Sequence, residues 1–174
     1  AFWGCNSLTT ITIPDSVITI GNYAFYYCSS LTTVTIPDSV TSIGNSAFSL
    51  CSSLTSIKVP DGVRSIGNNV FQVCSSLKSA SLGNGVTTIG VSAFEGCNSL
   101  TSITIPNSVR SIGVFAFYNC PALTIVTIPD SVTTIGEGAF EYCVSLTDIN
   151  VNASNSKYAS LEGILFNKDC STLI

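Results

Sequence analysis

Cysteine is the residue whose type and spacing could most readily support chemistry in this sequence. Seven cysteines recur at one constant interval, and an eighth, Cys170, falls outside that interval. Thiols of this kind form disulfides, ligate metal ions or act as nucleophiles. The seven in-phase residues are Cys5, Cys28, Cys51, Cys74, Cys97, Cys120 and Cys143.

The residues that accompany these thiols restrict the chemistry open to them. The chain contains no His, which excludes a Cys-His or a Ser-His-Asp arrangement. It has no C-x-x-C pair, so metal ligands would have to come from separate repeats, and we expect no metal site. Equivalent residues in adjacent coils lie about 4.8 Å apart, whereas a disulfide requires a Cβ separation of about 3.8 Å. We therefore expect buried free thiols that pack as small apolar groups, with a disulfide framework as the alternative.

A column of carboxylates is the second regular feature that could do chemistry. Neighbouring charges about 5 Å apart in water repel by only about 0.8 kcal/mol, so such a column does not require a cation. The nonapeptide motif of calcium-binding rolls is absent. We interpret these residues as solvated turn caps, with a calcium ladder as the alternative. The slot holds Asp15, Asp38, Asp61, Asn84, Asn107 and Asp130.

The cysteine column and the carboxylate column both belong to a 23-residue repeat, which occurs seven times without an insertion. Phenylalanine recurs from Phe2 to Phe140, and leucine from Leu8 to Leu146, at the same interval. The shared unit reads A-F-x-x-C-x-S-L-T-x-I-x-I-P-[DN]-S-V-x-[ST]-I-G-x-x. One such unit cannot bury enough apolar surface to fold alone, so neighbouring units must stack. The repeat therefore predicts a solenoid of seven 23-residue coils.

Each unit contains the signals for two extended segments and two turns. The alternation in residues 10–13 predicts a strand that points its isoleucines inward and its threonines outward, and the following proline ends it. V-x-x-I-G predicts a short second strand closed by a glycine, which we expect at positive φ. Asn22 and its equivalents are expected to N-cap a short helical turn, A-F-x-x-C, with Phe and Cys on one face.

One copy departs from the frame, in the fourth coil. Its strand carries Ala80 where other copies have Ile or Val, and its turn carries Gly83 and Gly85. A smaller core residue and added glycines predict that residues 78–86 form the softest joint of the array.

Composition and charge exclude several classes of function. Hydrophobic residues make up 45% of the chain, which argues against disorder, and only 9% are charged. The net charge of −4 is the wrong sign for nucleic-acid binding. No apolar run approaches the roughly 20 residues that a membrane-spanning helix needs. Because the chain begins inside a repeat at Ala1 and stops at Ile174, we expect it to be a fragment of a longer protein.

The outward strand positions form the most regular candidate binding surface. They are rich in hydroxyls and nearly free of charge, which favours docking of an extended protein or glycan; the alternative is that threonine simply suits strands and keeps the sheet soluble. Paired T-x-T columns are also typical of ice-binding proteins, although Lys58, Ile125, Asp148 and Asn150 interrupt the lattice. The candidate ligand-binding residues are Thr10, Thr12, Thr33, Thr35, Ser56, Lys58, Ser79, Ser81, Ser102, Thr104 and Thr127.

Aromatic residues occupy variable slots on the opposite edge of the repeat. Aromatic side chains are frequent anchors of interfaces. Tyr23, Tyr26 and Tyr27 cluster within one coil and form the best candidate patch; the alternative is lateral packing over the turns. The full set is Trp3, Tyr23, Tyr26, Tyr27, Phe115, Tyr118 and Tyr142.

The repeat frame L-x-x-I-x-I-P-x-x-V-x-x-I-G-x-x-A-F-x-x-C resembles the leucine-rich repeats of the BspA-like (Treponema-type) family, from Phe2 to about Val151. The tail "YASLEGILFNKDCSTLI" strengthens the resemblance and looks like a hairpin that turns at residues 167–169. The resemblance implies a leucine-rich-repeat solenoid over residues 1–151, followed by a non-repeat hairpin segment over residues 152–174 within the same domain.

What the resemblance implies about function is a secreted or cell-surface protein of bacteria or parasitic protists that adheres to host matrix proteins or cells. We therefore expect a binding module without a cofactor, whose partner is a protein or a glycan rather than nucleic acid or membrane. The alternatives are a passive structural spacer within a larger surface protein and a carbohydrate- or cell-wall-binding region.

Overall fold

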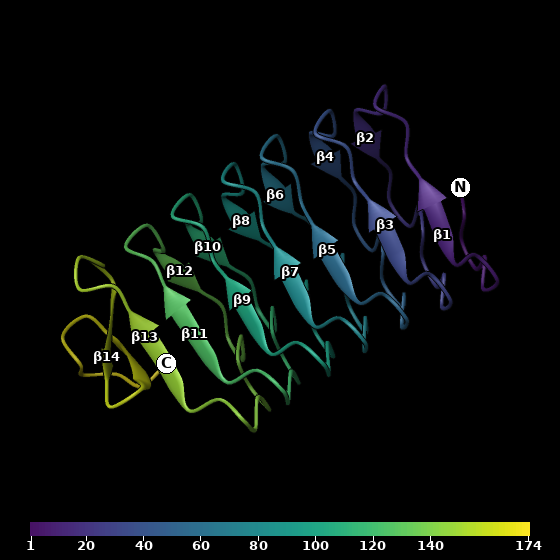
Figure 1. Cartoon of the computed structure of the whole chain (residues 1–174). Coiled ribbons are helices and arrows are strands. Elements are labelled where there is room, and N and C mark those ends of the chain that lie inside the picture. Colours follow the sequence, from purple (N-terminus) through teal and green to yellow (C-terminus); the bar gives the residue numbers. More distant parts are fainter.

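Each repeat contributes one strand to a main row and one shorter strand to a second row, and the chain winds through both rows as a solenoid (Figure 1). The computed structural model describes all residues from Ala1 to Ile174. The main row consists of β1 (Thr10–Thr12), β3 (Thr33–Thr35), β5 (Ser56–Lys58), β7 (Ser79–Ser81), β9 (Ser102–Thr104), β11 (Ile125–Ile128) and β13 (Asp148–Val151). The second row consists of β2 (Thr19–Ile20), β4 (Ser42–Ile43), β6 (Ser65–Ile66), β8 (Thr88–Ile89), β10 (Ser111–Ile112) and β12 (Thr134–Ile135).

All strand pairs within the two rows are parallel, and each residue pairs with its equivalent in the next repeat. We count a coil from the start of one main-row strand to the start of the next. Coil 1 then begins at Thr10, and β13 opens a seventh coil that lacks its second-row strand. The predicted solenoid of 23-residue coils with a C-terminal hairpin is confirmed, and seven copies of the repeat yield six complete coils.

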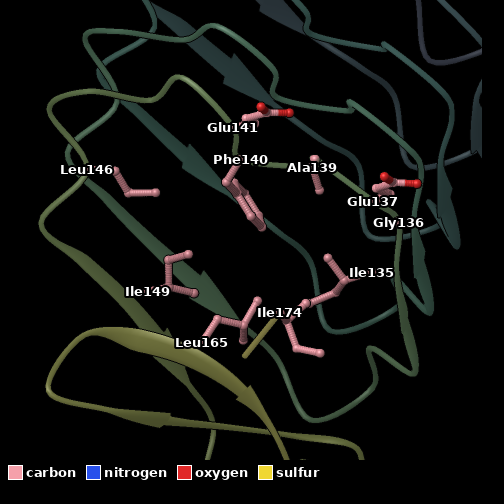
Figure 2. A pocket seen from close by; sticks show the side chains of 11 residues that line it. Ile135, Gly136, Glu137, Ala139, Phe140, Glu141, Leu146, Ile149, Leu165 and Ile174 are labelled. Atoms are coloured by element: carbon pink, nitrogen blue, oxygen red, sulfur yellow. The ribbon is translucent and has the colours of Figure 1, made fainter. Parts of the chain in front are cut away.

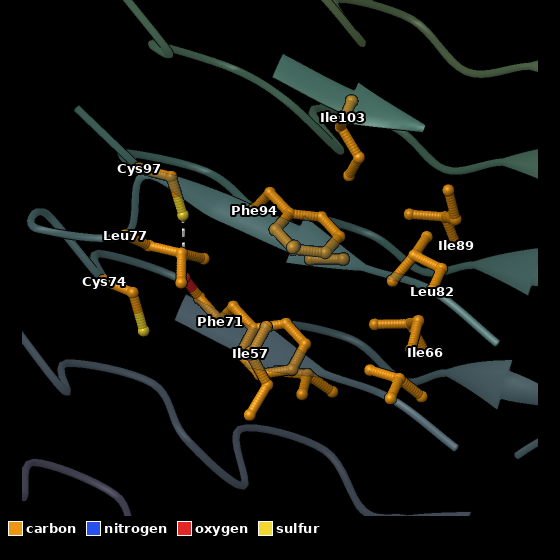
Figure 3. Packing of buried hydrophobic residues seen from close by; sticks show 14 of the residues in the cluster. Ile57, Ile66, Phe71, Cys74, Leu77, Leu82, Ile89, Phe94, Cys97 and Ile103 are labelled. Carbon is orange, nitrogen blue, oxygen red and sulfur yellow. Dashed lines mark hydrogen bonds between the residues drawn. The ribbon is translucent and has the colours of Figure 1, made fainter. Parts of the chain in front are cut away.

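The core is a stack of identical layers rather than a collection of different contacts. In-phase phenylalanine rings stack along the whole array with centroids 5.1 to 5.7 Å apart. The rings of Phe48, Phe71, Phe94 and Phe117 are fully buried. Figure 3 shows two of these rings packed among Ile57, Leu77 and Ile89 of neighbouring coils. The inward set predicted from the repeat therefore forms one continuous core of 41 buried residues.

The structure contains no helix, so the expected helical turn after each second-row strand is wrong. Tyr23 and Tyr27 adopt φ of 55° and 58°, which no right-handed helix allows. The amides of Tyr23, Phe25 and Tyr27 donate to carbonyls of the next coil, whereas those of Ala24, Tyr26 and Cys28 donate to carbonyls three residues back. Alternate amides thus donate to the neighbouring coil and to the local turn. In a helix all of them would donate to carbonyls within the helix, and none would be left for the neighbouring coil.

The repeat glycines do not have the positive φ that the sequence had suggested; at Gly44, Gly90, Gly113 and Gly136 it is lack of space that requires glycine. None of Gly21, Gly44, Gly67, Gly90, Gly113 and Gly136 has positive φ. A Cβ added to Gly90 would lie 2.7 Å from the backbone carbon of Gly67, and one added to Gly113 would lie 2.6 Å from that of Gly90. Side chains do not fit at these distances, so glycine permits the closest approach of successive coils.

The asparagines after these glycines do not act as N-caps either, because no helix follows them. Each side-chain oxygen instead accepts a hydrogen bond from the backbone of the next coil. Asn22 Oδ1 accepts from Asn45 N at 2.8 Å, Asn45 Oδ1 from Asn68 N at 2.9 Å, and Asn68 Oδ1 from Val91 N at 3.0 Å. The asparagines form a ladder that ties coils together.

The loosest joint lies between coil 2 and coil 3. No ladder pairs β3 with β5 or β4 with β6, so both rows are interrupted there. The ring step from Phe48 to Phe71, at 5.7 Å, is the longest of the phenylalanine stack. A Cβ on Gly67 would meet the nearest backbone atom only at 3.5 Å, much farther than at Gly90. Coil 3 therefore stands farther from its predecessor than coil 4 does.

The fourth coil, by contrast, is tightly seated. Ala80 pairs in register with Ile57 and Ile103, and a Cβ on Gly83 would lie against the carbonyl oxygen of Pro60. The glycines of this coil allow a close approach to coil 3. The hydrogen-bond pattern thus argues against residues 78–86 as the softest joint.

Amide hydrogen exchange is expected to locate this joint directly. The amides of Thr87 and Gly90 donate to carbonyls of Arg64 and Ile66, whereas the equivalent amides of Arg64 and Gly67 have no backbone acceptor. We expect Arg64 and Gly67 to exchange faster than Thr87 and Gly90, because only the latter must break an inter-coil hydrogen bond. Equal protection at the two pairs of positions, measured by NMR, would show that the joint is closed in solution.

The C-terminal hairpin covers the last coil. It consists of β14 (Tyr158–Leu161) and β15 (Ile164–Asn167), which pair antiparallel and turn at Glu162 and Gly163, with φ of 51° and 79°. The predicted turn at residues 167–169 is wrong for this hairpin; that segment belongs to a second, longer turn that brings Leu173 back beside Phe166. Gly163 carbonyl accepts from Ile149 N at 2.8 Å, so the hairpin occupies the free edge of β13.

Candidate ligand-binding faces

Parallel in-register pairing converts the outward strand residues into two straight columns. One begins with Thr10, Thr33 and Ser56, and the other with Thr12, Thr35 and Lys58. Every candidate ligand-binding residue of the sequence is exposed: Thr10, Thr12, Thr33, Thr35, Ser56, Lys58, Ser79, Ser81, Ser102, Thr104 and Thr127. The repeat therefore places all eleven candidates on one surface, which we call the strand face.

The hydroxyls of the strand face differ in their hydrogen bonding from those of the threonine column beside them. Thr32, Thr55 and Thr147, in the slot before each strand, donate their hydroxyls to the carbonyls of the equivalent residues one repeat earlier, at 3.1 to 3.3 Å. No strand-face side chain makes any hydrogen bond within the chain. Their donors and acceptors all point to solvent. The strand face is therefore a surface whose hydrogen-bonding capacity is unused by the fold.

A shallow hollow of about 480 Å³ indents the strand face at the joint between coils 2 and 3. Asp15 and Asp38 of the aspartate column line it together with Thr35, Ser56 and Lys58. Lys58 is the one cation of the strand-face columns, and it lines the hollow together with the two carboxylates. The two aspartates lie in turns, as the sequence predicted, and these turns border the strand face.

The in-phase thiols lie inside the core, with one exception. Cys28, Cys51, Cys74, Cys97, Cys120 and Cys143 are buried, free and hydrogen-bonded. Each donates its S–H to the carbonyl of the phenylalanine in the preceding repeat, as Cys97 does to Phe71 at 3.2 Å (Figure 3). Cys5 is exposed in this structure, so the expectation that it is buried is wrong. Cys170 is also exposed.

Burial makes the core thiols poor nucleophiles. Desolvation raises the pKa of Cys51 to about 12, with a smaller contribution from the neighbouring Cys28. Desolvation likewise raises the pKa of Cys74 and Cys97. The thiolate is the reactive form of cysteine, and it is suppressed at these positions. The column is therefore a structural element of the core.

A thiol titration is expected to separate the two classes of cysteine. At pH 8 the native protein should react with a disulfide reagent at Cys5 and Cys170 only, and the unfolded protein at all eight residues. Since burial raises the folded pKa of Cys51, Cys74 and Cys97 above the ordinary value of 9.0, the free energy of unfolding should also fall as pH rises above about 9. Rapid reaction of more than two thiols in the native state would contradict the buried column.

Two of the three tyrosines of the candidate aromatic patch pack against each other. Tyr23 and Tyr26 lie with ring centroids 5.6 Å apart, and both pack against Trp3, at 5.2 and 4.7 Å. Tyr27 joins no aromatic pair and projects separately, with 46% of its surface exposed. The patch is therefore Trp3, Tyr23 and Tyr26. A second trio, Phe115, Tyr118 and Tyr142, lies on the same edge at the other end of the array.

The largest hollow, about 560 Å³, lies at the C-terminal end of the core beneath the hairpin (Figure 2). Phe140, the last ring of the stack, forms its floor, and apolar side chains of Leu146, Ile149 and Leu165 surround it. The carboxylates of Glu137 and Glu141 lie at its edge. The next in-phase position after Phe140 is Gly163, so the hollow is the place of a missing ring and not a site with convergent polar groups.

The residue that closes this end was not predicted from the sequence. Asn155 is fully buried, and its side-chain nitrogen donates to the carbonyls of Pro129 at 2.8 Å and Val132 at 3.0 Å. Its side-chain oxygen accepts from the amides of Lys157 and Tyr158, both at 2.8 Å. Asn155 stands in the slot that valine fills in every earlier coil, so an in-phase polar substitution was the available signal.

The fold and the strand face define the class of this protein: it is a leucine-rich-repeat solenoid. The sequence model described as "BspA type Leucine rich repeat region" matches residues 1–99 and 74–171, in six copies. The chain belongs to this family. No curated protein matches the chain. Families of this kind are repeat scaffolds and not enzyme families.

Solved structures of bacterial leucine-rich-repeat proteins resemble the chain. A leucine rich cell surface protein from Faecalibacterium prausnitzii is 39% identical with a TM-score of 0.82, over 92% of this chain and 43% of that one. The T. pallidum leucine rich repeat protein is 29% identical with a TM-score of 0.59, over 81% and 57%. The pneumococcal vaccine antigen PcpA is 26% identical with a TM-score of 0.59, over 95% and 36%.

The chain thus spans less than half the length of the F. prausnitzii protein that it matches. In this structure no helix has the length and apolar character needed to cross a membrane.

Proposed function

We propose that this chain is a protein-binding part of a bacterial surface adhesin, and that the strand face is its binding surface. The observation that carries the proposal is the contrast between two hydroxyl columns. The threonines before each strand are engaged by backbone carbonyls, whereas the strand-face hydroxyls are exposed and have no partner in the chain. An extended polypeptide lying across the coils would find hydrogen-bonding groups at every step.

The geometry of the strand face suits an extended protein segment. Its two columns are straight and nearly uncharged, so docking requires little desolvation of charge. The hollow with Asp38 and Lys58 interrupts this uniformity at one place and gives a ligand a fixed register along the array. A host matrix or cell-surface protein is the ligand that we infer.

Placement outside the cell is part of the same proposal. It is supported by the resemblance to a protein described as a cell surface protein and to a pneumococcal vaccine antigen. The strand face is also rich in hydroxyls and weakly charged, so it would form few non-specific ion pairs with host proteins.

Surface-plasmon binding to a panel of matrix proteins and glycans tests the proposal. Saturable binding to a matrix protein is expected, and it should be lost in Ser79→Arg and Thr104→Arg, because each places a long charged side chain across the columns. Asn107→Arg is the matched control: it adds the same charge in coil 5, at an exposed turn beside the strand face. Circular dichroism checks that each variant is folded.

The alternatives give different outcomes in the same experiment. A passive spacer would bind nothing while folded. A carbohydrate-binding region would respond to glycans and not to matrix proteins. Equal loss of binding in Asn107→Arg would move the ligand off the strand columns.

A further inference from the structure

A second surface, on the edge opposite the strand face, gathers aromatic rings and carboxylates at one place. The turns that follow the second-row strands stack in register, so each slot of the turn forms a column along the array. Glu95, Tyr118 and Glu141 stand in one such column, at equivalent positions of three successive repeats, while Phe115 and Tyr142 come from the columns on either side. These five residues line a hollow of about 350 Å³ across coils 4 to 6.

The three rings are held in a defined arrangement. Phe115 and Tyr142 both meet Tyr118 edge-on, at centroid distances of 5.2 Å and interplanar angles of 72° and 74°. The rings remain accessible, with 37% of Phe115 and 57% of Tyr142 exposed. Lateral packing of the turns therefore leaves much of these aromatic surfaces free for a ligand.

The fold makes room for this arrangement at Gly138. That residue occupies the slot of Phe115 in the next coil, with φ of 61°. A Cβ there would clash with the Phe115 ring and lie 3.0 Å from the carboxylate oxygen Oε2 of Glu141. The Phe115 ring thus lies over Gly138 with the Glu141 carboxylate beside it.

The hollow is electrostatically negative. Glu95 is hydrogen-bonded by Gln72 at 3.0 Å, a neutral partner, and Glu141 has no side-chain partner in the chain. None of the six Lys and Arg residues lines the hollow. Desolvation is the largest cause that raises the pKa of Tyr118, and the nearby Tyr142, Glu141 and Glu95 raise it further.

From this geometry we propose that the hollow formed by Glu95, Phe115, Tyr118, Glu141 and Tyr142 binds a basic side chain, arginine or lysine, of a partner polypeptide. A guanidinium or ammonium group is attracted to aromatic faces, and carboxylates that lack a cation complete its recognition. The site is separate from the strand face. It lies on the turns that follow the second-row strands, which we call the turn edge, and it gives the solenoid a second contact with its own specificity. A neutral saccharide would use the rings but would leave both carboxylates without a charged partner.

An NMR titration of the ¹⁵N-labelled chain with acetyl-Gly-Arg-Gly-amide tests the site. Saturable shifts are expected at the amides of Phe115, Tyr118, Glu141 and Tyr142. The same peptide with citrulline in place of arginine keeps the shape and removes the charge. We expect it to bind about tenfold more weakly, because citrulline makes neither the cation–π contact nor the ion pair.

Variants of both kinds of group complete the test. Tyr118→Leu and Glu141→Gln should each weaken binding of the arginine peptide by about threefold or more. Glu162→Gln, which makes the same charge change in the hairpin turn, and Tyr23→Leu, in the other aromatic patch, should leave it unchanged. Unchanged spectra away from the substitution show that each variant is folded.

Several results would overturn the proposal. Absence of saturable shifts, or equal binding of the citrulline peptide, would show that the hollow does not recognise a cation. Equal weakening in Glu162→Gln would show that only net charge matters. Shifts at the same amides with a neutral oligosaccharide, and none with the arginine peptide, would make the hollow a glycan site. Because these readouts lie on the turn edge, they are independent of whether the strand face binds a matrix protein.

Discussion

Phe94→Ala is expected to destabilise the solenoid by about 3–5 kcal/mol. The Phe94 ring is fully buried and stacks on Phe71 at 5.2 Å and on Phe117 at 5.3 Å. Its removal leaves a cavity in the middle of the stack and deprives two neighbours of contact. The loss extends beyond one coil, because a repeat that stands alone cannot fold and depends on the interfaces to both neighbours.

Chemical denaturation followed by circular dichroism measures this loss, with Phe2→Ala as the matched control. Phe2 has the same slot and the same chemistry, but it is 39% exposed and stacks on one ring only, Phe25. We expect the control to lower the free energy of unfolding by less than half as much. A similar loss in the two variants would show that the stack does not transmit stability along the array.

Gly90→Ala is expected to lower the free energy of unfolding by about 3 kcal/mol, although replacing glycine by alanine often stabilises a protein. The new Cβ would meet the carbonyl carbon and oxygen of Gly67 at 2.7 Å, and backbone atoms cannot move aside without separating coil 4 from coil 3. Separation would also lengthen the hydrogen bond from Gly90 N to Ile66 O, which is 2.9 Å long. The cost therefore combines overpacking with a weakened inter-coil bond.

Gly67→Ala supplies the control for this prediction at the same slot one coil earlier. Its Cβ would meet only the side-chain oxygen of Asn45 at 2.6 Å, with the nearest backbone atom at 3.5 Å. Asn45 can rotate away, although its side-chain oxygen then gives up the hydrogen bond from Asn68 N, so we expect a loss of about 1 kcal/mol, well below that of Gly90→Ala. If the denaturation midpoints of Gly67→Ala and Gly90→Ala fall equally, the joint between coils 2 and 3 is as close as the others.

Much of this structure could be predicted from the sequence because the repeat specifies side-chain direction. The alternation around Ile57 and Ile103 predicted strands, and the phase of Phe71 and Cys74 predicted the core, since apolar residues at a fixed phase must all point the same way in stacked coils. The exposed columns of the strand face followed from the same alternation. Each strand and each core residue packs only against the next copy of the same unit, so the repeat alone was enough to predict them.

The turns could not be predicted with the same success. Asn22, Tyr23 and the A-F-x-x-C segment carry signals of a helical turn when read alone. In the solenoid their amides have a competing acceptor, the carbonyls of the next coil, and alternate amides take it. The role of Gly90 was misassigned for the same reason: the atoms that exclude a side chain there belong to Gly67, one full repeat away in the chain.

The two candidate sites differ in the same way: one could be predicted from the sequence and the other could not. The eleven strand-face residues were identified from the sequence, because exposure on a regular strand depends on period alone. The turn-edge hollow was not, although Phe115, Tyr118 and Tyr142 were noted as aromatics. Their meeting with Glu95 and Glu141 depends on how three turns stack and on the space left by Gly138.

The sequence by itself determined the coil, its inward and outward faces and the family to which the chain belongs, because a 23-residue period repeated seven times fixes which side chains share a face. Only the tertiary structure decided the distance between coils. That distance sets the shape of the turns, the need for glycine, the looser joint after coil 2 and the cap at Asn155. The physical reason is that backbone amides choose between local and inter-coil acceptors only when the neighbouring coil is in place.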